Sequence, residues 1–200
     1  MSAWPGIFVC LVGPSGAGKD TLLRLAREKL AVEPGFSFPR RGVTRPPSAH
    51  EEHTELGEET FAEGLRDGRF ALAWRAHGLG YAIGRDVLPA LAAGDVVICN
   101  VSRDVIAAAR QNFPHVAAVL VTASDHELAR RLIARGRETS ADIDQRLARN
   151  RDVFKHFVAD FVIDNSGALP EAAEKLAAIL RALRSAERRE TAAGSMNNLI

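Results

Sequence analysis

A glycine-rich loop near the N-terminus constrains the fold of this chain more than any other feature. Residues 13–21 read Gly-Pro-Ser-Gly-Ala-Gly-Lys-Asp-Thr, and they follow an apolar, β-branched run at Ile7–Val12 that predicts a buried strand. After the loop, apolar residues recur at helical spacing, at Leu22, Leu23, Ala26 and Leu30. A strand, a glycine-rich turn and an amphipathic helix in this order are typical of a nucleotide-phosphate site.

The spacing of this loop matches the Walker A pattern at every position but one. Glycines let backbone N–H groups turn inward around the α and β phosphates of a nucleotide, and the following helix adds its positive N-terminal end. Lys19 is placed to reach the β and γ phosphates, so we expect it to be catalytic. A glycine-rich turn without a ligand is disfavoured, because strand, loop, lysine and helix all occur in the required order. The predicted ATP site comprises Gly13, Pro14, Ser15, Gly16, Ala17, Gly18, Lys19, Asp20 and Thr21.

The departure from the pattern is Asp20, which stands where a Ser or Thr hydroxyl normally binds magnesium. A carboxylate is also a hard oxygen ligand, and we predict that Asp20 holds Mg²⁺ directly or through water. The alternatives are that Thr21 binds the metal or that Asp20 only caps the helix. A carboxylate usually ends a later strand of such proteins, whereas the run Val97–Asn100 ends in an amide, so Asp20 is a candidate to replace that charge.

The length, composition and charge of the chain limit the classes of protein to which it can belong. With 200 residues, 46% of them hydrophobic and 26% charged, the chain suits one globular domain, which we place at residues 1–184. The formal net charge of +1 argues against a dedicated nucleic-acid binder. Cys10 and Cys99 lie inside apolar runs and are expected to be buried thiols of a cytoplasmic protein. No apolar run reaches membrane-spanning length, so we expect no membrane partner.

Further apolar runs alternate with helical segments. The alternation predicts an α/β fold, a three-layer sandwich in which helices cover both faces of a parallel sheet. Helix starts are expected at Ser102, at the capping-box spacing Ser124–Glu127, at Ser140 and at Pro170. The predicted strands are Phe70–Trp74, Val96–Val101, Val116–Val121 and Phe161–Ile163.

Two regions depart from this alternation. Pro39–Glu59 is polar and reads as an excursion from the sheet, either a loop or a small lid. The tail at residues 185–200 is polar with no apolar face, so we expect it to be disordered.

With these residues in view, the chain resembles the guanylate kinase family over most of its length. The features that align in order are the Gly13–Thr21 loop, Val43–Pro46, His77–Tyr81, Arg135-Gly136 and Arg146-Leu147. The resemblance implies an acceptor-binding arm at about residues 39–86 and an arginine-rich lid at about residues 135–149. It also places Arg45 as a ligand of the acceptor phosphate.

The differences from that family concern the acceptor. A second arginine of the family falls at Ser48, and a phosphate-contacting tyrosine falls at His53. A base-reading Glu falls at Leu72 and a base-reading Asp at Asn100. A site that selects a base by hydrogen bonds loses that selectivity when the hydrogen-bonding groups are absent. Without the two carboxylates the pocket should therefore not select guanine, although it keeps a ligand for the acceptor phosphate. This pattern predicts a phosphorylated acceptor that has no nucleobase.

Within the family, the chain is similar to the ribose 1,5-bisphosphate phosphokinases, and Asp20 belongs to that similarity. The similarity implies ATP and Mg²⁺, the product 5-phosphoribosyl 1-diphosphate and an association with phosphonate metabolism. Arg103, which follows Ser102, is explained equally well as a solvent-exposed side chain. His77 is explained equally well as a structural residue of a turn. The predicted substrate-binding residues are Arg45, His53, His77, Tyr81, Asn100 and Ser102.

Arginines cluster in the region of the expected lid. In similar kinases such arginines neutralise the phosphoryl group in transit, so Arg137 and Arg146 are predicted to be catalytic and Arg135 to lie against adenine. Arg131 and Arg151 are expected only to form solvated pairs with acids one helical turn away. Asn165-Ser166 is expected to border the base.

Three other functions compete with the sugar-phosphate kinase. They are a guanylate kinase acting on GMP, a non-catalytic guanylate kinase-like module, and a nucleic-acid regulator. Leu72 and Asn100 disfavour the first, the intact loop with Lys19 disfavours the second, and the charge balance disfavours the third. The expected partner is therefore a small phosphorylated sugar, with no nucleic acid and no membrane, bound by a monomer or homodimer.

Overall fold

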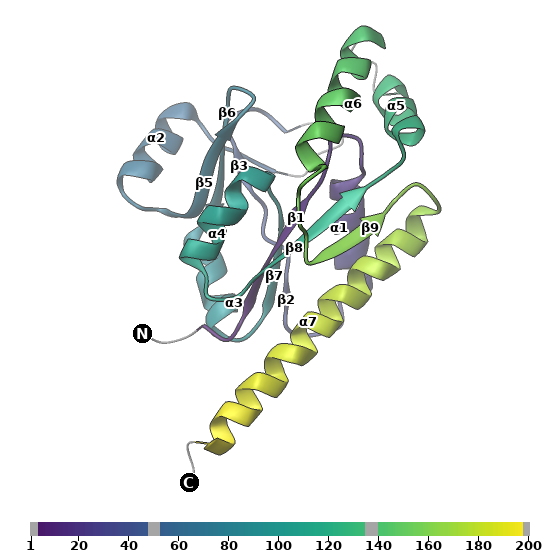
Figure 1. The fold of residues 1–200 in the computed structure, drawn as a ribbon. Coiled ribbons are helices and arrows are strands. Elements are labelled where there is room, and N and C mark those ends of the chain that lie inside the picture. The colour runs from purple at the N-terminus through teal and green to yellow at the C-terminus, as the bar shows by residue number, and fades with distance from the viewer. Residues whose placement is uncertain (1–3, 48–52, 135–139, 198–200) are drawn as a thin grey trace.

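A five-stranded parallel sheet forms the centre of the computed structural model, which describes residues 4–47, 53–134 and 140–197 (Figure 1). Its strands lie in the order β2-β7-β1-β8-β9, and every neighbouring pair is parallel. The predicted parallel α/β sheet is therefore confirmed. The bounds are β1 Ile7–Val12, β2 Phe36–Ser37, β7 Val96–Asn100, β8 Val116–Thr122 and β9 Phe161–Asp164.

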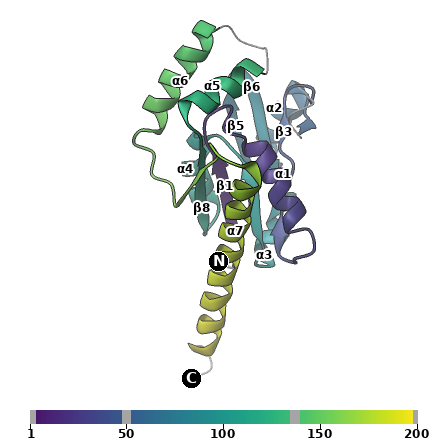
Figure 2. The same cartoon turned by 90° about the vertical axis from the view of Figure 1, so that its right-hand side faces the viewer.

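Helices cover both faces of this sheet, as the three-layer prediction requires. All six residues of β1 are buried, because alternate side chains enter the cores on opposite faces. Val9 and Leu11 pack with α1 (Lys19–Lys29) and α7 (Leu169–Asn197). Phe8 and Cys10 pack on the other face. That face is covered by α3 (Leu88–Ala92) and α4 (Ile106–Asn112), so α1 and α4 flank the sheet from opposite sides (Figure 2).

The polar excursion forms a second, smaller sheet with the strand order β4-β3-β6-β5 and one helix, α2 (Glu58–Arg66). Phe70–Trp74 was therefore assigned to the wrong sheet: it lies in β5, which pairs antiparallel with β6 and not with the central sheet. The apolar run specified a strand but not its partner. The strands of this second sheet are β3 Gly42–Val43, β4 Thr54–Glu55, β5 Phe70–Ala76 and β6 Leu79–Gly84.

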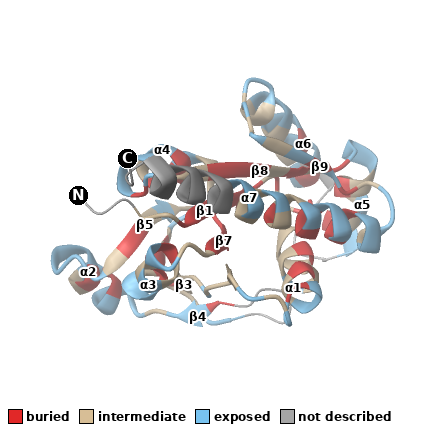
Figure 3. Cartoon of the chain, turned by 90° about the horizontal axis from the view of Figure 1, so that it is seen from below, coloured by how far each residue is buried: buried red, intermediate tan, exposed pale blue. Residues whose placement is uncertain are grey.

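A two-residue turn explains why β5 pairs with β6. His77 has φ 51° and Gly78 has φ 75°, so both residues lie in the left-handed region. Hairpins favour this turn because its twist matches that of the two strands. The second sheet lies to one side of the central sheet (Figure 3).

Helix α6 (Ser140–Phe154) contains most of the expected lid at residues 135–149, and α5 (Asp125–Ala134) precedes it. The Ser124 hydroxyl accepts a hydrogen bond from the backbone N–H of Glu127 at 3.3 Å, as the predicted helix start requires. Arg135 and Arg137, both predicted site residues, lie outside the described residues, as does Ser48.

The last helix differs from expectation. Pro170 lies in the first turn of α7, as predicted, but α7 continues to Asn197, where a disordered tail was expected from residue 185. Residues 185–193 are rich in Ala, Arg and Glu, which favour a helix even without an apolar face to bury. Two short 3₁₀ segments, Arg85–Val87 and Arg103–Val105, complete the described elements. None of the described helices is long and apolar enough to span a membrane.

Candidate active site

A cleft of about 1160 Å³ opens at the carboxyl ends of β1 and β7, between the central sheet, the second sheet and α6. This edge is where parallel α/β proteins bind their ligands. Although the whole chain carries a net charge of only +1, basic side chains outnumber acidic ones among the described residues of the cleft wall. The acidic ones are Asp20 and Asp104; the basic ones are Lys19, Arg24, Arg27, Arg40, Arg41, Arg45, Arg103, Arg146 and Arg149.

The phosphate loop has the backbone that its glycines predict. Gly13, Gly16 and Gly18 have φ angles of 148°, 90° and 88°. A Cβ on Gly13 would also collide with the carbonyl oxygen of Val121, so both the dihedral and the space require glycine there. Gly18 forms the N-cap of α1. The loop therefore leads directly into the positive end of that helix.

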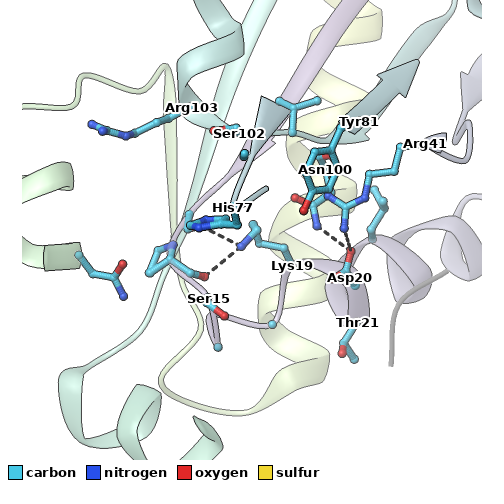
Figure 4. Close-up of a pocket in the computed structure, with 18 of the residues that line it drawn as sticks. Ser15, Lys19, Asp20, Thr21, Arg41, His77, Tyr81, Asn100, Ser102 and Arg103 are labelled. Atoms are coloured by element: carbon cyan, nitrogen blue, oxygen red, sulfur yellow. Dashed lines mark hydrogen bonds and ion pairs between the residues drawn. The ribbon is translucent and has the colours of Figure 1, made fainter. Parts of the chain in front are cut away.

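Lys19 lies across this loop. Its Nζ donates to the carbonyl oxygens of Gly13 at 2.8 Å and of Pro14 at 2.9 Å (Figure 4). The ammonium group is thereby held at the cleft wall, beside the loop backbone that the sequence assigns to the nucleotide phosphates. The lysine is thus positioned by the loop itself.

Two side chains that the sequence analysis placed elsewhere support the loop from behind. Asn165 is 1% exposed, and its Nδ2 donates to the carbonyl oxygen of Ala17 at 2.8 Å. Arg131 donates to the Asn165 carbonyl oxygen at 2.8 Å and to the Gly16 and Ala17 carbonyl oxygens at 3.4 Å each. Asn165 was expected to border the base, and it is absent from the cleft wall.

The interpretation of Arg131 as a merely solvated partner of an acid is therefore wrong. Arg131 does donate to Glu127 one turn earlier at 2.7 Å, but it is largely buried and its other nitrogens reach the loop. Hydrogen bonds from Arg130 and Arg131 lower the pKa of Glu127 to about 2. Sequence spacing showed the helical pair but not the loop on the other side.

A polar cluster forms where α1 begins. The amide Nδ2 of Asn100 donates to Oδ1 of Asp20 at 2.6 Å. Arg41 lies 3.9 Å from the same carboxylate oxygen, and its Nη1 donates to the Asn100 carbonyl oxygen at 3.3 Å. Arg41 was missed in the sequence, where the only signal was an arginine pair, Arg40-Arg41, at the start of the polar excursion.

Two aromatic rings form the wall beside this cluster. Trp74 of β5 and Tyr81 of β6 are directly paired across the hairpin, and their rings stack with centroids 5.2 Å apart and planes 9° apart. The Arg41 guanidinium lies 5.6 Å from the centre of the Tyr81 ring. Leu72, at the position where the resemblance places a base-reading Glu, is 3% exposed and absent from the cleft wall. The described wall near Tyr81 thus presents a cation and aromatic rings.

The remaining predicted site residues either line the cleft or contact the backbone of a residue that does. Arg45, His77, Ser102 and Arg146 line the cleft. His53 does not: its ring is 5% exposed, and Nε2 lies 3.1 Å from the Arg45 carbonyl oxygen. His53 therefore contacts the backbone that presents Arg45, a role that its position in the sequence did not reveal.

Helix α6 closes the cleft from the other side. Arg103, beside Ser102, donates to the carbonyl oxygen of Val153 at 3.0 Å and so links the start of α4 to α6. Asn150 of α6 also lines the cleft, and its buried Nδ2 has no hydrogen-bond partner among the described residues. An orphaned buried donor at a cleft wall indicates a place for a ligand oxygen. Nothing in the sequence singled out Asn150.

The two cysteines lie under the site but take no part in it. Cys10 and Cys99 are neighbours on β1 and β7, and both are free. Burial raises the pKa of Cys10 to about 12 and raises that of Cys99 further. Both thiols therefore stay protonated and inert at neutral pH.

Comparison with known proteins gives a consistent result. A family model described as guanylate kinase matches residues 7–183. A protein of Methylobacterium radiotolerans named ribose 1,5-bisphosphate phosphokinase PhnN is 56% identical over 178 residues, covering 89% of this chain and 99% of that protein. A protein of Thiobacillus denitrificans with the same name is 44% identical, covering 85% and 90%. The crystal structure of guanylate kinase from Anaplasma phagocytophilum superposes with a TM-score of 0.65 at 20% identity, covering 92% of this chain and 89% of that one.

Proposed function

The chain belongs to the guanylate kinase family, and we propose that it transfers the γ-phosphoryl group of ATP to the 1-phosphate of ribose 1,5-bisphosphate. The product of this transfer is 5-phosphoribosyl 1-diphosphate. The observation that carries the proposal is the composition of the cleft. An intact phosphate loop faces a wall of arginines and aromatic rings, with an amide at Asn100 and a buried leucine at position 72.

The loop and Lys19 act on the nucleotide. Inward-facing backbone N–H groups and the start of α1 bind the phosphates, and Lys19 stabilises the negative charge on the phosphoryl group as it is transferred. For this the Nζ has to exchange its two loop carbonyls for phosphate oxygens. The exchange conserves hydrogen bonds and replaces neutral acceptors with charged ones.

The acceptor needs no catalytic base. A phosphate oxygen of ribose 1,5-bisphosphate is already an anionic nucleophile, so positioning and charge neutralisation are sufficient. We assign the acceptor to the part of the cleft wall that carries Arg45, His77, Tyr81, Asn100 and Ser102. We assign contacts with the phosphoryl group in transit to Arg146 and to the orphaned amide of Asn150, which line the cleft from α6. We retain Arg137 as a second cation for that group and Arg135 as the neighbour of adenine.

The residues at the start of α1 fit a magnesium ion. Asp20 lines the cleft with a carboxylate whose side chain is 34% exposed, and Thr21, the next residue of α1, also lines the cleft. Both described contacts of that carboxylate use Oδ1. Mg²⁺ prefers one or two protein oxygens together with substrate phosphates, and the described residues hold no group of three acidic, His or Cys side chains. When bound, Mg²⁺ would neutralise the nucleotide phosphates.

Reduced thiols and the use of ATP support our assignment of the protein to the cytoplasm. The rival activity on GMP is less well supported, because Leu72 is buried and Asn100 offers an amide that Asp20 already engages. The rival of a non-catalytic module does not account for an intact loop and a positioned Lys19.

One assay tests the proposal. Purified protein is given ATP and Mg²⁺ with either ribose 1,5-bisphosphate or GMP, and products are identified by phosphorus NMR. We expect a diphosphate signal with the sugar bisphosphate and no GDP. Turnover of GMP alone would identify a guanylate kinase instead, and ATP binding without turnover of either acceptor would favour the module. The Lys19→Met variant controls for contaminating kinases.

A further inference from the structure

Arg41 immediately precedes β3 and Arg45 lies two residues beyond its end, and both line the cleft. Three residues lie between them, so the four Cα-to-Cα steps from Arg41 to Arg45 span at most about 14 Å when extended. A bisphosphorylated sugar carries one phosphate at each end of a small ring. It therefore needs two cationic positions separated by about the width of a sugar, and the short segment 41–45 around β3 carries such a pair.

Arg41 is held ready to bind an anion. Its guanidinium lies over the Tyr81 ring, donates to the Asn100 carbonyl oxygen and pairs loosely with Asp20 at 3.9 Å, while its side chain remains 14% exposed. A guanidinium carries five N–H donors in a fixed plane, more than these contacts use. A planar fork that is already ordered binds phosphate with little further loss of conformational entropy.

The direction of Asp20 indicates which phosphate Arg41 meets. Consecutive residues of a helix point about 100° apart. Lys19 turns toward the loop and His77, whereas Asp20 turns the other way, toward Asn100 and Arg41 (Figure 4). We assign the moving phosphoryl group to Lys19 and the loop, and Arg41 lies on the Oδ1 side of Asp20, where Asn100 also binds; a phosphate at Arg41 is therefore the one that does not react.

From these contacts we infer that Arg41 determines specificity by binding the 5-phosphate of the acceptor, while Arg45 binds the reacting 1-phosphate. This inference rests on the proposed function. It assigns a role to a residue outside the set that the sequence resemblance supplied. It also explains why Asn100 and Asp20 are joined: together they fix the guanidinium against the Tyr81 ring.

The test uses the two singly phosphorylated halves of the acceptor, ribose 5-phosphate and ribose 1-phosphate. Their binding to the full-length protein is titrated by phosphorus NMR in the presence of a non-hydrolysable ATP analogue and Mg²⁺. For Arg41→Met we expect ribose 5-phosphate to bind about 10- to 100-fold more weakly, the loss typical of a charge-assisted hydrogen bond, with ribose 1-phosphate unchanged. For Arg45→Met we expect the reverse. In turnover, Arg41→Met should raise the KM for ribose 1,5-bisphosphate by a similar factor.

Arg75→Met is the matched control. Arg75 belongs to the same small sheet, lies 4.9 Å from the centre of the Phe61 ring and pairs with Glu58, but it does not line the cleft. It should leave binding of both sugar phosphates unchanged. Binding of the ATP analogue and the melting temperature report that each variant is folded. If Arg41→Met is unstable, Arg41→Lys replaces it; this variant keeps the charge and should retain part of the affinity for ribose 5-phosphate.

The inference is overturned if Arg41→Met binds ribose 5-phosphate and ribose 1,5-bisphosphate as tightly as the parent protein does. It is equally overturned if both monophosphates weaken to the same extent, which would indicate a general electrostatic or structural role. Failure of the proposed function has a different signature, since the parent protein would then not phosphorylate ribose 1,5-bisphosphate at all.

Discussion

The two sides of the cleft are built in different ways. The side that we assign to the nucleotide consists of nine consecutive residues, Gly13–Thr21, and its donors are mostly backbone N–H groups fixed by three glycines with positive φ. The side that we assign to the acceptor draws its side chains from separate segments, with Arg41 before β3, the Trp74–Tyr81 pair on a hairpin and Asn100 at the end of β7.

This contrast teaches where each property of the enzyme resides. A contiguous backbone nest recognises phosphates that every nucleotide shares, so it can stay constant while the acceptor changes. An assembled wall of side chains can be altered one residue at a time. Asp20 is the residue that joins the two, because it belongs to the loop and contacts Asn100 and Arg41.

The largest effect is expected on the nucleotide side. Lys19→Met removes the cation that stabilises the phosphoryl group during transfer, and it should lower kcat by about 10³-fold, whichever acceptor is offered. Steady-state kinetics measure this, and circular dichroism checks the fold. Turnover within threefold of the parent protein would contradict the phosphate-loop mechanism.

A smaller effect is expected where the two sides meet. Asp20→Ser restores the usual hydroxyl at the metal position but leaves Asn100 and Arg41 without their carboxylate. We expect the Mg²⁺ concentration for half-maximal activity to rise several-fold and the KM for the acceptor to rise about tenfold. A change in acceptor KM alone, with metal dependence unaltered, would show that Asp20 serves only the acceptor side.

On the acceptor side alone, Trp74→Ala removes the ring that stacks on Tyr81. Loss of an aromatic pair costs about 0.5–1.5 kcal/mol, so the KM for the acceptor should rise roughly 3- to 10-fold while the KM for ATP stays constant. Parallel titrations of both substrates measure the ratio. An equal rise for ATP would mean that the two sides are not independent.

On the nucleotide side alone, Asn165→Ala deletes the buried amide that donates to Ala17. We expect the free energy of unfolding to fall by about 1–2 kcal/mol and the KM for ATP to rise a few-fold, with the acceptor KM unchanged. Urea unfolding and initial rates provide the two numbers. Ser166→Ala, one residue further on and outside the cleft wall, serves as the comparison variant.

The smallest effect concerns the acid that anchors Arg131. The pKa of Glu127 is about 2 in the folded protein, mainly through hydrogen bonds from Arg130, against an ordinary value of 4.5. Its contribution to stability is therefore present above pH 4.5 and is lost as the pH falls through the folded value near 2. Glu127→Gln should flatten the acid limb of the melting-temperature profile within that window, and an unchanged profile would contradict the contact.

The sequence predicted much of the central fold and only part of the site. The strand at Ile7–Val12 has the predicted bounds, because a run buried on both faces has only one place in a parallel sheet. Phe70–Trp74 was recognised as a strand but given the wrong sheet, because an apolar pattern specifies burial and not the partner. His53 was expected at the acceptor for the same reason: its position in the excursion was known, but the direction of its side chain was not.

By itself the sequence determined the phosphate loop, since nine adjacent residues with fixed dihedral preferences need no distant partner to define their shape. Only the tertiary structure decided which arginines line the cleft beside Tyr81 and which support the loop. Arg41 and Arg131 look alike in the sequence, and each is given its role by residues 59 and 34 positions away, Asn100 and Asn165. A guanidinium reaches several ångströms from its backbone, so its function depends on what the fold places within that reach.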